Sequence, residues 1–191
     1  MKVCVLLGNT RQKSNTEAVV KIFVEELIRK GFQVKSVPLR EKTVQSCIGC
    51  DTCHDIMDSF GCALADDMQE IAEEILSSDL LVFSSPIYTW FATAPLKAVM
   101  DRLFAFSKWP ENADSFNLMK KQHFALITTS GDECAQNCDL LDEGIRRLAN
   151  YAHRPYIGYF AAQDKDGINR AEVVDGIRAF AEKCAGSLRP A

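Results

Sequence analysis

This chain is organised around Leu7-Gly8-Asn9-Thr10-Arg11-Gln12-Lys13-Ser14-Asn15-Thr16, which follows an apolar run and precedes a segment with helical spacing of apolar residues. A strand that ends in small polar residues and then opens a helix at Ser14 presents free backbone N–H groups and the positive end of a helix dipole. Ser14 and Glu17 also have the spacing of a capping box. Thr10, Arg11, Asn15 and Thr16 nevertheless add far more hydrogen-bonding capacity than one helix end needs. The stretch therefore predicts an anion site.

Apolar runs alternate with helical patterns along the chain. Four runs are continuous, as expected of parallel strands covered on both faces, and a fifth is weaker: residues 3–7, 80–83, 124–127, 156–160 and 32–37. Helices are predicted from Ser14 to Gly31, from 68 to 76 after Asp66 or Asp67, from Pro95 to about 106, from 140 to 151 and from 171 to 188. This alternation predicts an α/β fold: a flavodoxin-like, doubly wound, five-stranded parallel sheet of order 2-1-3-4-5 with helices on both faces.

Length and composition favour an ordinary globular chain. Its 191 residues are 47% hydrophobic and 25% charged, with a formal net charge of −4. We expect a single domain over 1–191 with a cysteine-rich insertion at about 41–65, no membrane span and no nucleic-acid partner. We also expect a cytoplasmic location, where the eight cysteines are reduced thiols or metal ligands.

The predicted sheet brings two further loops to the first one, because ligands of this fold bind at the carboxyl ends of the strands. Residues 84–94 carry Tyr88, Trp90 and Phe91, which can border a flat heteroaromatic ring or anchor a subunit contact. Residues 128–137 include Gly131, where the backbone can approach a ligand closely. FMN fits this combination better than ATP, because the chain has no P-loop motif.

The pieces that match a known family are Gly8-Asn-Thr-Arg11, Ser14-Asn-Thr16, Ser85-Pro-Ile-Tyr88 and Pro95-Leu-Lys-Ala-Val-Met-Asp101-Arg102. Up to about residue 160 the chain resembles the NADPH-dependent FMN reductase family. The resemblance implies that the FMN phosphate is held by Asn9, Arg11, Ser14, Asn15 and Thr16. It implies that the isoalloxazine is bordered by Pro86, Ile87, Tyr88, Thr89 and Trp90 and, on its other edge, by Thr129, Ser130 and Gly131. It also implies NAD(P)H as co-substrate and a homodimer or homotetramer.

A second signal is the spacing of Cys47, Cys50, Cys53 and Cys62. Such thiols can converge on one metal centre, and they resemble those of the iron-sulfur flavoprotein branch of the family, which implies a [4Fe-4S] cluster. Free thiols are the alternative that we favour, with zinc a distant third. A haem attachment at Cys50-Asp-Thr-Cys53-His54 has little support in a chain without an export signal.

Together these features predict an FMN-dependent NAD(P)H oxidoreductase that passes electrons to flavin, a quinone or a similar small acceptor, or to a redox partner protein. An iron-sulfur electron carrier and a non-enzymatic flavin sensor are the alternatives. Hydride transfer to a flavin needs no general acid or base, so no catalytic side chain is predicted. Cys4 and Cys184 are expected in the core, and Cys134 and Cys138 either reach the site or pack a helix.

Overall fold

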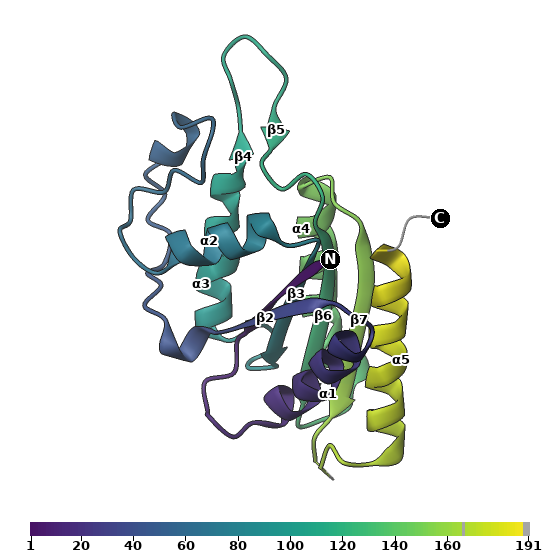
Figure 1. Cartoon of the computed structure of the whole chain (residues 1–191). Coiled ribbons are helices and arrows are strands. Elements are labelled where there is room, and N and C mark those ends of the chain that lie inside the picture. Colours follow the sequence, from purple (N-terminus) through teal and green to yellow (C-terminus); the bar gives the residue numbers. More distant parts are fainter. Residues whose placement is uncertain (166, 189–191) are drawn as a thin grey trace.

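A five-stranded parallel sheet forms the centre of the molecule (Figure 1). The computed structural model describes residues 1–165 and 167–188. The strands are β1 (Lys2–Leu7), β2 (Gln33–Pro38), β3 (Leu80–Pro86), β6 (His123–Ser130) and β7 (Tyr156–Gln163). Their order is β2-β1-β3-β6-β7, and every neighbouring pair is parallel. The predicted fold class and strand order are confirmed.

Helices cover both faces of this sheet (Figure 1). The helices are α1 (Asn15–Arg29), α2 (Met68–Ser77), α3 (Ala94–Arg102), α4 (Asp139–Tyr151) and α5 (Ala171–Leu188). α1 and α5 pack together on one face, and α2, α3 and α4 cover the other. Single 3-10 turns are η1 (Leu39–Glu41), η2 (Thr52–His54), η3 (Leu103–Phe106) and η4 (Cys134–Gln136). Gly31 ends α1 at a φ of 87°, as predicted for the left-handed end of a helix.

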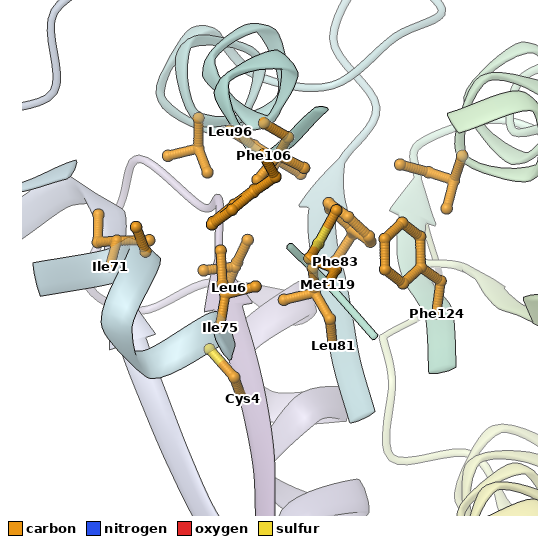
Figure 2. Close-up of a cluster of buried hydrophobic side chains, with 14 of the residues drawn as sticks. Cys4, Leu6, Ile71, Ile75, Leu81, Phe83, Leu96, Phe106, Met119 and Phe124 are labelled. Atoms are coloured by element: carbon orange, nitrogen blue, oxygen red, sulfur yellow. The ribbon is translucent and has the colours of Figure 1, made fainter. Parts of the chain in front are cut away.

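Each face of the sheet has its own apolar core. The core under α2, α3 and α4 contains Leu6, Phe83 and Phe124, with the two phenylalanine rings edge to face at 5.4 Å between centroids (Figure 2). Full burial of such side chains contributes about 1.5–3 kcal/mol each. Cys4 lies in this core and Cys184 in the core under α1 and α5, as expected. The cores hold the strand ends, and therefore the loops after them, in fixed positions.

Three strands continue well beyond their predicted ends. β7 ends at Gln163, β3 at Pro86 and β6 at Ser130, so that Thr129 and Ser130 lie in a strand and not in a loop. At these polar ends the side-chain hydroxyls add hydrogen bonds to the backbone pairing: Ser84 Oγ donates to the Leu6 carbonyl at 2.9 Å, and Thr128 Oγ1 to the Ser85 carbonyl at 2.8 Å.

Three other details differ from the expectation. A short antiparallel hairpin of β4 (Ser107–Lys108) and β5 (Phe116–Asn117) extends from the end of η3 and was not predicted (Figure 1). Ile28, placed on the apolar stripe of the first helix, is 55% exposed. Tyr159 is also exposed, because β7 is an edge strand and is less covered than the central ones. Among the described residues, no helix is both long and apolar enough to cross a membrane.

Candidate functional site

The first loop begins at Gly8, which lies against the end of β3. The Gly8 N–H donates to the Ser84 carbonyl at 2.8 Å, and its own carbonyl accepts from Thr93 Oγ1 at 2.5 Å. A Cβ at position 8 would lie 2.7 Å from the Ser84 oxygen and 2.9 Å from Leu96 Cβ. Only glycine fits this close approach, and its two hydrogen bonds join the loop after β1 to β3 and to the loop that follows β3.

A buried polar network fixes the shape of the first loop. Asn9 is buried, and its Nδ2 donates to the Arg11 carbonyl at 2.7 Å and to Glu17 Oε2 at 2.8 Å. Glu17 also accepts from Arg40 Nη1 at 3.0 Å. Asn9 Oδ1 has no hydrogen-bond partner in the described chain. The predicted phosphate ligand Asn9 thus faces inward and organises the loop through its amide nitrogen.

The start of α1 keeps anion-binding capacity at the surface. Ser14 caps the helix, its Oγ accepting from the Glu17 N–H at 3.1 Å, as predicted. Asn15 and Thr16 follow in the first turn, where the helix itself gives their N–H groups no partner. Arg11 and Asn15 are exposed. The positive end of the helix and the Arg11 guanidinium therefore suit a phosphate.

The second loop is a tight turn with an unusual backbone. Tyr88 and Phe91 exchange backbone hydrogen bonds of 3.0 and 3.1 Å. The two residues between them, Thr89 and Trp90, have φ values of 49° and 61°, which normally favour glycine or asparagine. Tyr88 and Trp90 are 44% and 55% exposed, whereas the Phe91 side chain packs against the core. The turn holds two aromatic rings at the surface at a cost in backbone strain.

Hydrogen bonds also join the third loop to the other two. Thr16 Oγ1 and Thr129 Oγ1 lie 2.7 Å apart, and both residues are buried. The Ile87 N–H donates to the Thr129 carbonyl at 2.8 Å. Thr10 Oγ1 and Tyr88 Oη lie 3.4 Å apart across the gap between the first two loops. The three predicted loops therefore form one connected edge.

A cavity of about 200 Å³ opens at this edge. Its lining contains five residues predicted to contact the flavin ring: Ile87, Thr89, Trp90, Ser130 and Gly131. A larger cavity, of about 580 Å³, runs along α1 beside β2 and is lined by Lys13, Ser14 and Asn15 among others. It contains no aromatic side chain, so the smaller cavity is the one that suits a flat ring.

The four predicted cysteines line a separate cavity of about 100 Å³ at the C-terminal end of α3. Cys47 and Cys50 are exposed, and Cys53 and Cys62 are half-buried. A hydrogen bond from the Thr52 hydroxyl lowers the pKa of Cys50, whereas burial raises that of Cys53. Within the described ranges, no three His, Cys, Asp or Glu side chains are arranged to hold a single metal ion.

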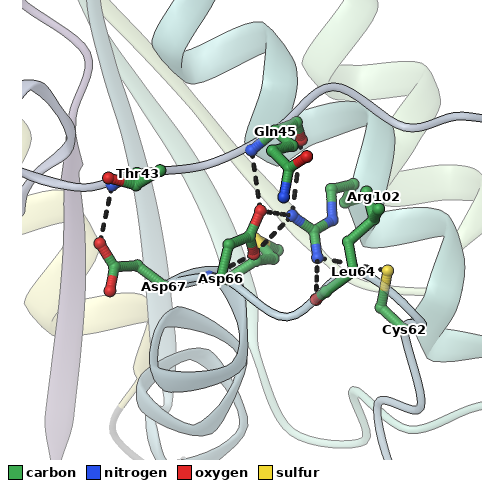
Figure 3. A network of polar contacts seen from close by, with 8 residues as sticks. Thr43, Gln45, Cys62, Leu64, Asp66, Asp67 and Arg102 are labelled. Carbon is green, nitrogen blue, oxygen red and sulfur yellow. Dashed lines mark hydrogen bonds and ion pairs between the residues drawn. The ribbon is translucent and has the colours of Figure 1, made fainter.

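A buried arginine closes one side of the cysteine cavity (Figure 3). Arg102 is 1% exposed; its Nη1 lies 2.6 Å from Asp66 Oδ2, and its Nη2 donates to Cys62 Sγ at 3.2 Å. Burial opposes ionisation of Asp66, but hydrogen bonds from Arg102 and from the Gln45 and Met68 N–H groups outweigh it and lower its pKa. The Asp66–Arg102 pair thus fixes the segment that carries Cys62.

Lys108 of β4 holds the other side of the segment. Its side chain is buried, and Nζ donates to the carbonyls of Cys53 at 2.8 Å and Phe60 at 3.4 Å. Burial lowers the pKa of Lys108. The sequence predicted Asp66 only as a possible cap of the helix that begins at Met68, where Asp66 Oδ1 does accept from the Met68 N–H at 3.1 Å, and it predicted no role for Arg102 or Lys108. Arg102 does lie in the motif that begins at Pro95, but its partner is 36 positions away and the pairing needs the fold.

Curated proteins with similar sequences include flavoproteins. An iron-sulfur flavoprotein of Archaeoglobus fulgidus is 31% identical over 110 residues, which are 58% of this chain and 49% of the relative. YwqN of Bacillus subtilis, a candidate NAD(P)H-dependent FMN-containing oxidoreductase, is 27% identical over 134 residues, 69% of this chain and 68% of YwqN. The chain spans about half the length of the iron-sulfur flavoproteins that it matches.

Solved structures share the fold. The NAD(P)H:quinone oxidoreductase from Methanothermobacter marburgensis superposes with a TM-score of 0.73 at 15% identity, over 100% of this chain and 97% of that one. The family model described as NADPH-dependent FMN reductase matches residues 1–143 of the 191. The chain therefore belongs to the NADPH-dependent FMN reductase family.

Proposed function

We propose that this chain binds FMN and works as an NAD(P)H-dependent oxidoreductase that delivers electrons to flavin, a quinone or a similar small acceptor. One observation supports this above all: Ile87, Thr89, Trp90, Ser130 and Gly131 come from two separate segments and line one cavity, whose wall is joined to the start of α1 by the contact of Thr129 with Thr16. When bound, FMN would supply the redox chemistry, accepting a hydride and releasing electrons. The side chains bind and orient it.

Each loop would have a separate task. Arg11, Ser14, Asn15 and Thr16 would receive the phosphate at the positive end of α1. The turn of Thr89 and Trp90 would hold an aromatic face against the ring and leave the other ring face open to nicotinamide and acceptor in turn. We also propose a homodimer or homotetramer, supported by the exposure of Tyr88 and Trp90 at the rim of the cavity, because exposed aromatics often anchor interfaces.

A comparison of FMN with riboflavin tests the site. Arg11→Ala removes a charge aimed at the phosphate, so it should weaken FMN binding by about 1.5–3 kcal/mol and leave riboflavin binding unchanged. Trp90→Ala should weaken both ligands alike. Arg178→Ala, at an exposed position of α5, is the matched charge control and should change neither FMN affinity nor riboflavin affinity. Equal losses of FMN and riboflavin affinity in Arg11→Ala would contradict the phosphate assignment.

Turnover tests the enzymatic part of the proposal. Protein loaded with FMN should oxidise NADH or NADPH in the presence of free flavin, a quinone or an azo dye. Flavin binding without turnover on any acceptor would favour the sensor alternative. A cytoplasmic location remains a prediction, supported by the eight cysteines, which are all free thiols in the structure.

A [4Fe-4S] cluster is the second candidate, because Cys47, Cys50, Cys53 and Cys62 line one cavity and the relative from A. fulgidus is named an iron-sulfur flavoprotein. A cluster is larger than one ion, so thiolates spread around a cavity fit it, and the Arg102 donor to Cys62 would offset negative charge. Bound there, it would supply one-electron transfer.

Iron and sulfide analysis of anaerobically purified protein separates the alternatives for the cysteine cavity. A cluster predicts about four iron atoms per chain, lost in Cys62→Ser and retained in Cys184→Ser, whose thiol lies in the other core. Metal-free protein in which Cys47, Cys50, Cys53 and Cys62 can all be alkylated would support the free-thiol interpretation. One zinc per chain would support the third alternative.

A further inference from the structure

Two other cysteines lie directly beside the proposed flavin cavity. Cys134 belongs to η4 and Cys138 is the N-cap residue of α4. Their sulfurs lie 3.5 and 3.7 Å from Ser130 Oγ, and Ser130 lines the cavity. The Ser130 hydroxyl donates to the Asp132 carbonyl at 2.6 Å, so its oxygen accepts from the Cys138 thiol. Both sulfurs therefore converge on one residue of the cavity wall.

The two thiols differ in access. Cys138 is fully buried, whereas Cys134 is half-buried and can be reached from outside. Burial raises the pKa of Cys138 to about 12. The hydrogen bond with Ser130 lowers this pKa, but burial together with the nearby Cys134 outweighs it, so the reduced form of Cys138 is a neutral thiol. An accessible sulfur beside a shielded one is typical of a redox dithiol. In such a pair the accessible thiol attacks the substrate disulfide, and the shielded thiol then displaces the substrate from the mixed disulfide.

One backbone turn separates the pair, since the Cys138 N–H donates to the Cys134 carbonyl at 2.9 Å. On a regular helix, Cβ atoms four residues apart are about 5–6 Å from each other. A disulfide needs about 3.5–4.5 Å. Closing the bond must therefore tighten the short η4 turn, and a bond formed under such constraint is readily reduced.

We propose that Cys134 and Cys138 form a redox-active pair that takes electrons from the adjacent flavin and reduces disulfide substrates. The inference rests on the proposed flavin function. The Cys134–Cys138 disulfide accepts two electrons and two protons, its S–S bond breaks and two S–H bonds form, with flavin reduced by NAD(P)H as the source. The Cys134 thiolate then attacks a small or protein disulfide and releases one thiol. Cys138 displaces the second thiol and restores the internal disulfide.

Peptide mass spectrometry can follow this pair alone, because cleavage after Lys121 and Arg146 gives a peptide with Cys134 and Cys138 and no other cysteine. FMN-loaded protein is oxidised with diamide, then its flavin is reduced anaerobically with NADPH or, independently, by light and EDTA. Free thiols are alkylated before digestion. We expect an internal disulfide after diamide and two alkylated cysteines after flavin reduction, but a persistent disulfide when FMN is omitted.

Three results would overturn the inference. The first is that diamide forms no disulfide in this peptide. The second is that the disulfide persists although the flavin absorbance is bleached. The third is that Cys134→Ser still reduces a disulfide dye with NADPH. The second leaves the proposed flavin function intact, whereas failure to bind FMN would overturn both proposals. Cys134→Ser should lose dye reduction and retain reduction of free FMN, and Cys184→Ser, whose thiol lies in the core under α1 and α5, should retain both.

Discussion

Replacing Thr16 and Thr129 by valine tests the contact that joins α1 to β6. Their hydroxyl oxygens lie 2.7 Å apart, and both residues are 1% exposed. Neither hydroxyl has another side-chain partner in the described chain. Valine has almost the shape of threonine, so the substitutions change hydrogen bonding and leave packing nearly intact.

The magnitudes follow from burial. Thr16→Val leaves the Thr129 hydroxyl buried and unpaired, and Thr129→Val does the same to Thr16, so each should lower the free energy of unfolding by about 1–3 kcal/mol. The double variant removes both polar groups and should lie within about 0.5 kcal/mol of the parent. The coupling energy, which is the difference between the double variant and the sum of the two single losses, should therefore be about 2–6 kcal/mol in magnitude.

Urea unfolding of the apoprotein, followed by circular dichroism, measures all three variants. FMN and riboflavin titrations of the same proteins separate the structural role of Thr16 from its proposed binding role. If Thr16 also holds the phosphate, the double variant should recover stability but keep a lowered affinity for FMN alone. Additive losses, with the double variant as unstable as the sum of the single ones, would refute the reasoning.

Three further outcomes are expected. Gly8→Ala should lower the free energy of unfolding by about 1–3 kcal/mol, since a Cβ would lie 2.7 Å from the Ser84 oxygen. An unchanged urea midpoint would argue against this close contact between Gly8 and Ser84. Asp66→Asn should remove an acid-sensitive part of stability. The folded-state pKa of Asp66 is lowered, so its contribution is complete above the unfolded-state pKa of about 3.9 and is lost as the pH falls through the folded value; equal pH slopes in both proteins would disprove it. Thr89→Asn should raise stability by about 0.5–1 kcal/mol because asparagine tolerates a φ of 49°, and a lower melting temperature would count against backbone strain there.

Four of the five strands were accessible from the sequence because their central residues are continuous apolar runs, and the weaker run of the fifth still marked β2. The strand ends were not, since Ser84 and Thr128 are polar; there, hydroxyl bonds to Leu6 and Ser85 on neighbouring strands add to the backbone pairing. Such bonds depend on pairings between distant segments, which a linear pattern does not reveal.

The candidate site could likewise be predicted in part from the sequence. Composition and spacing predicted that three loops meet, and Trp90 and Ser130 do line one cavity. Spacing could not show that Asn9 points inward to Glu17, because that contact depends on the path of the loop. Nor could it show the buried ion pair of Asp66 and Arg102, which two separate segments contribute.

The buried Lys108 has a consequence for how this scaffold can change over evolution. Its ammonium fixes the carbonyls of Cys53 and Phe60, while most of the residues between them are exposed. Insertions or deletions there would alter the interval between Cys53 and Cys62 without disturbing either attachment point. A lineage could therefore gain, modify or lose a metal centre through a few codons, while the edge formed by the three loops, at the opposite end of α3, stays unchanged.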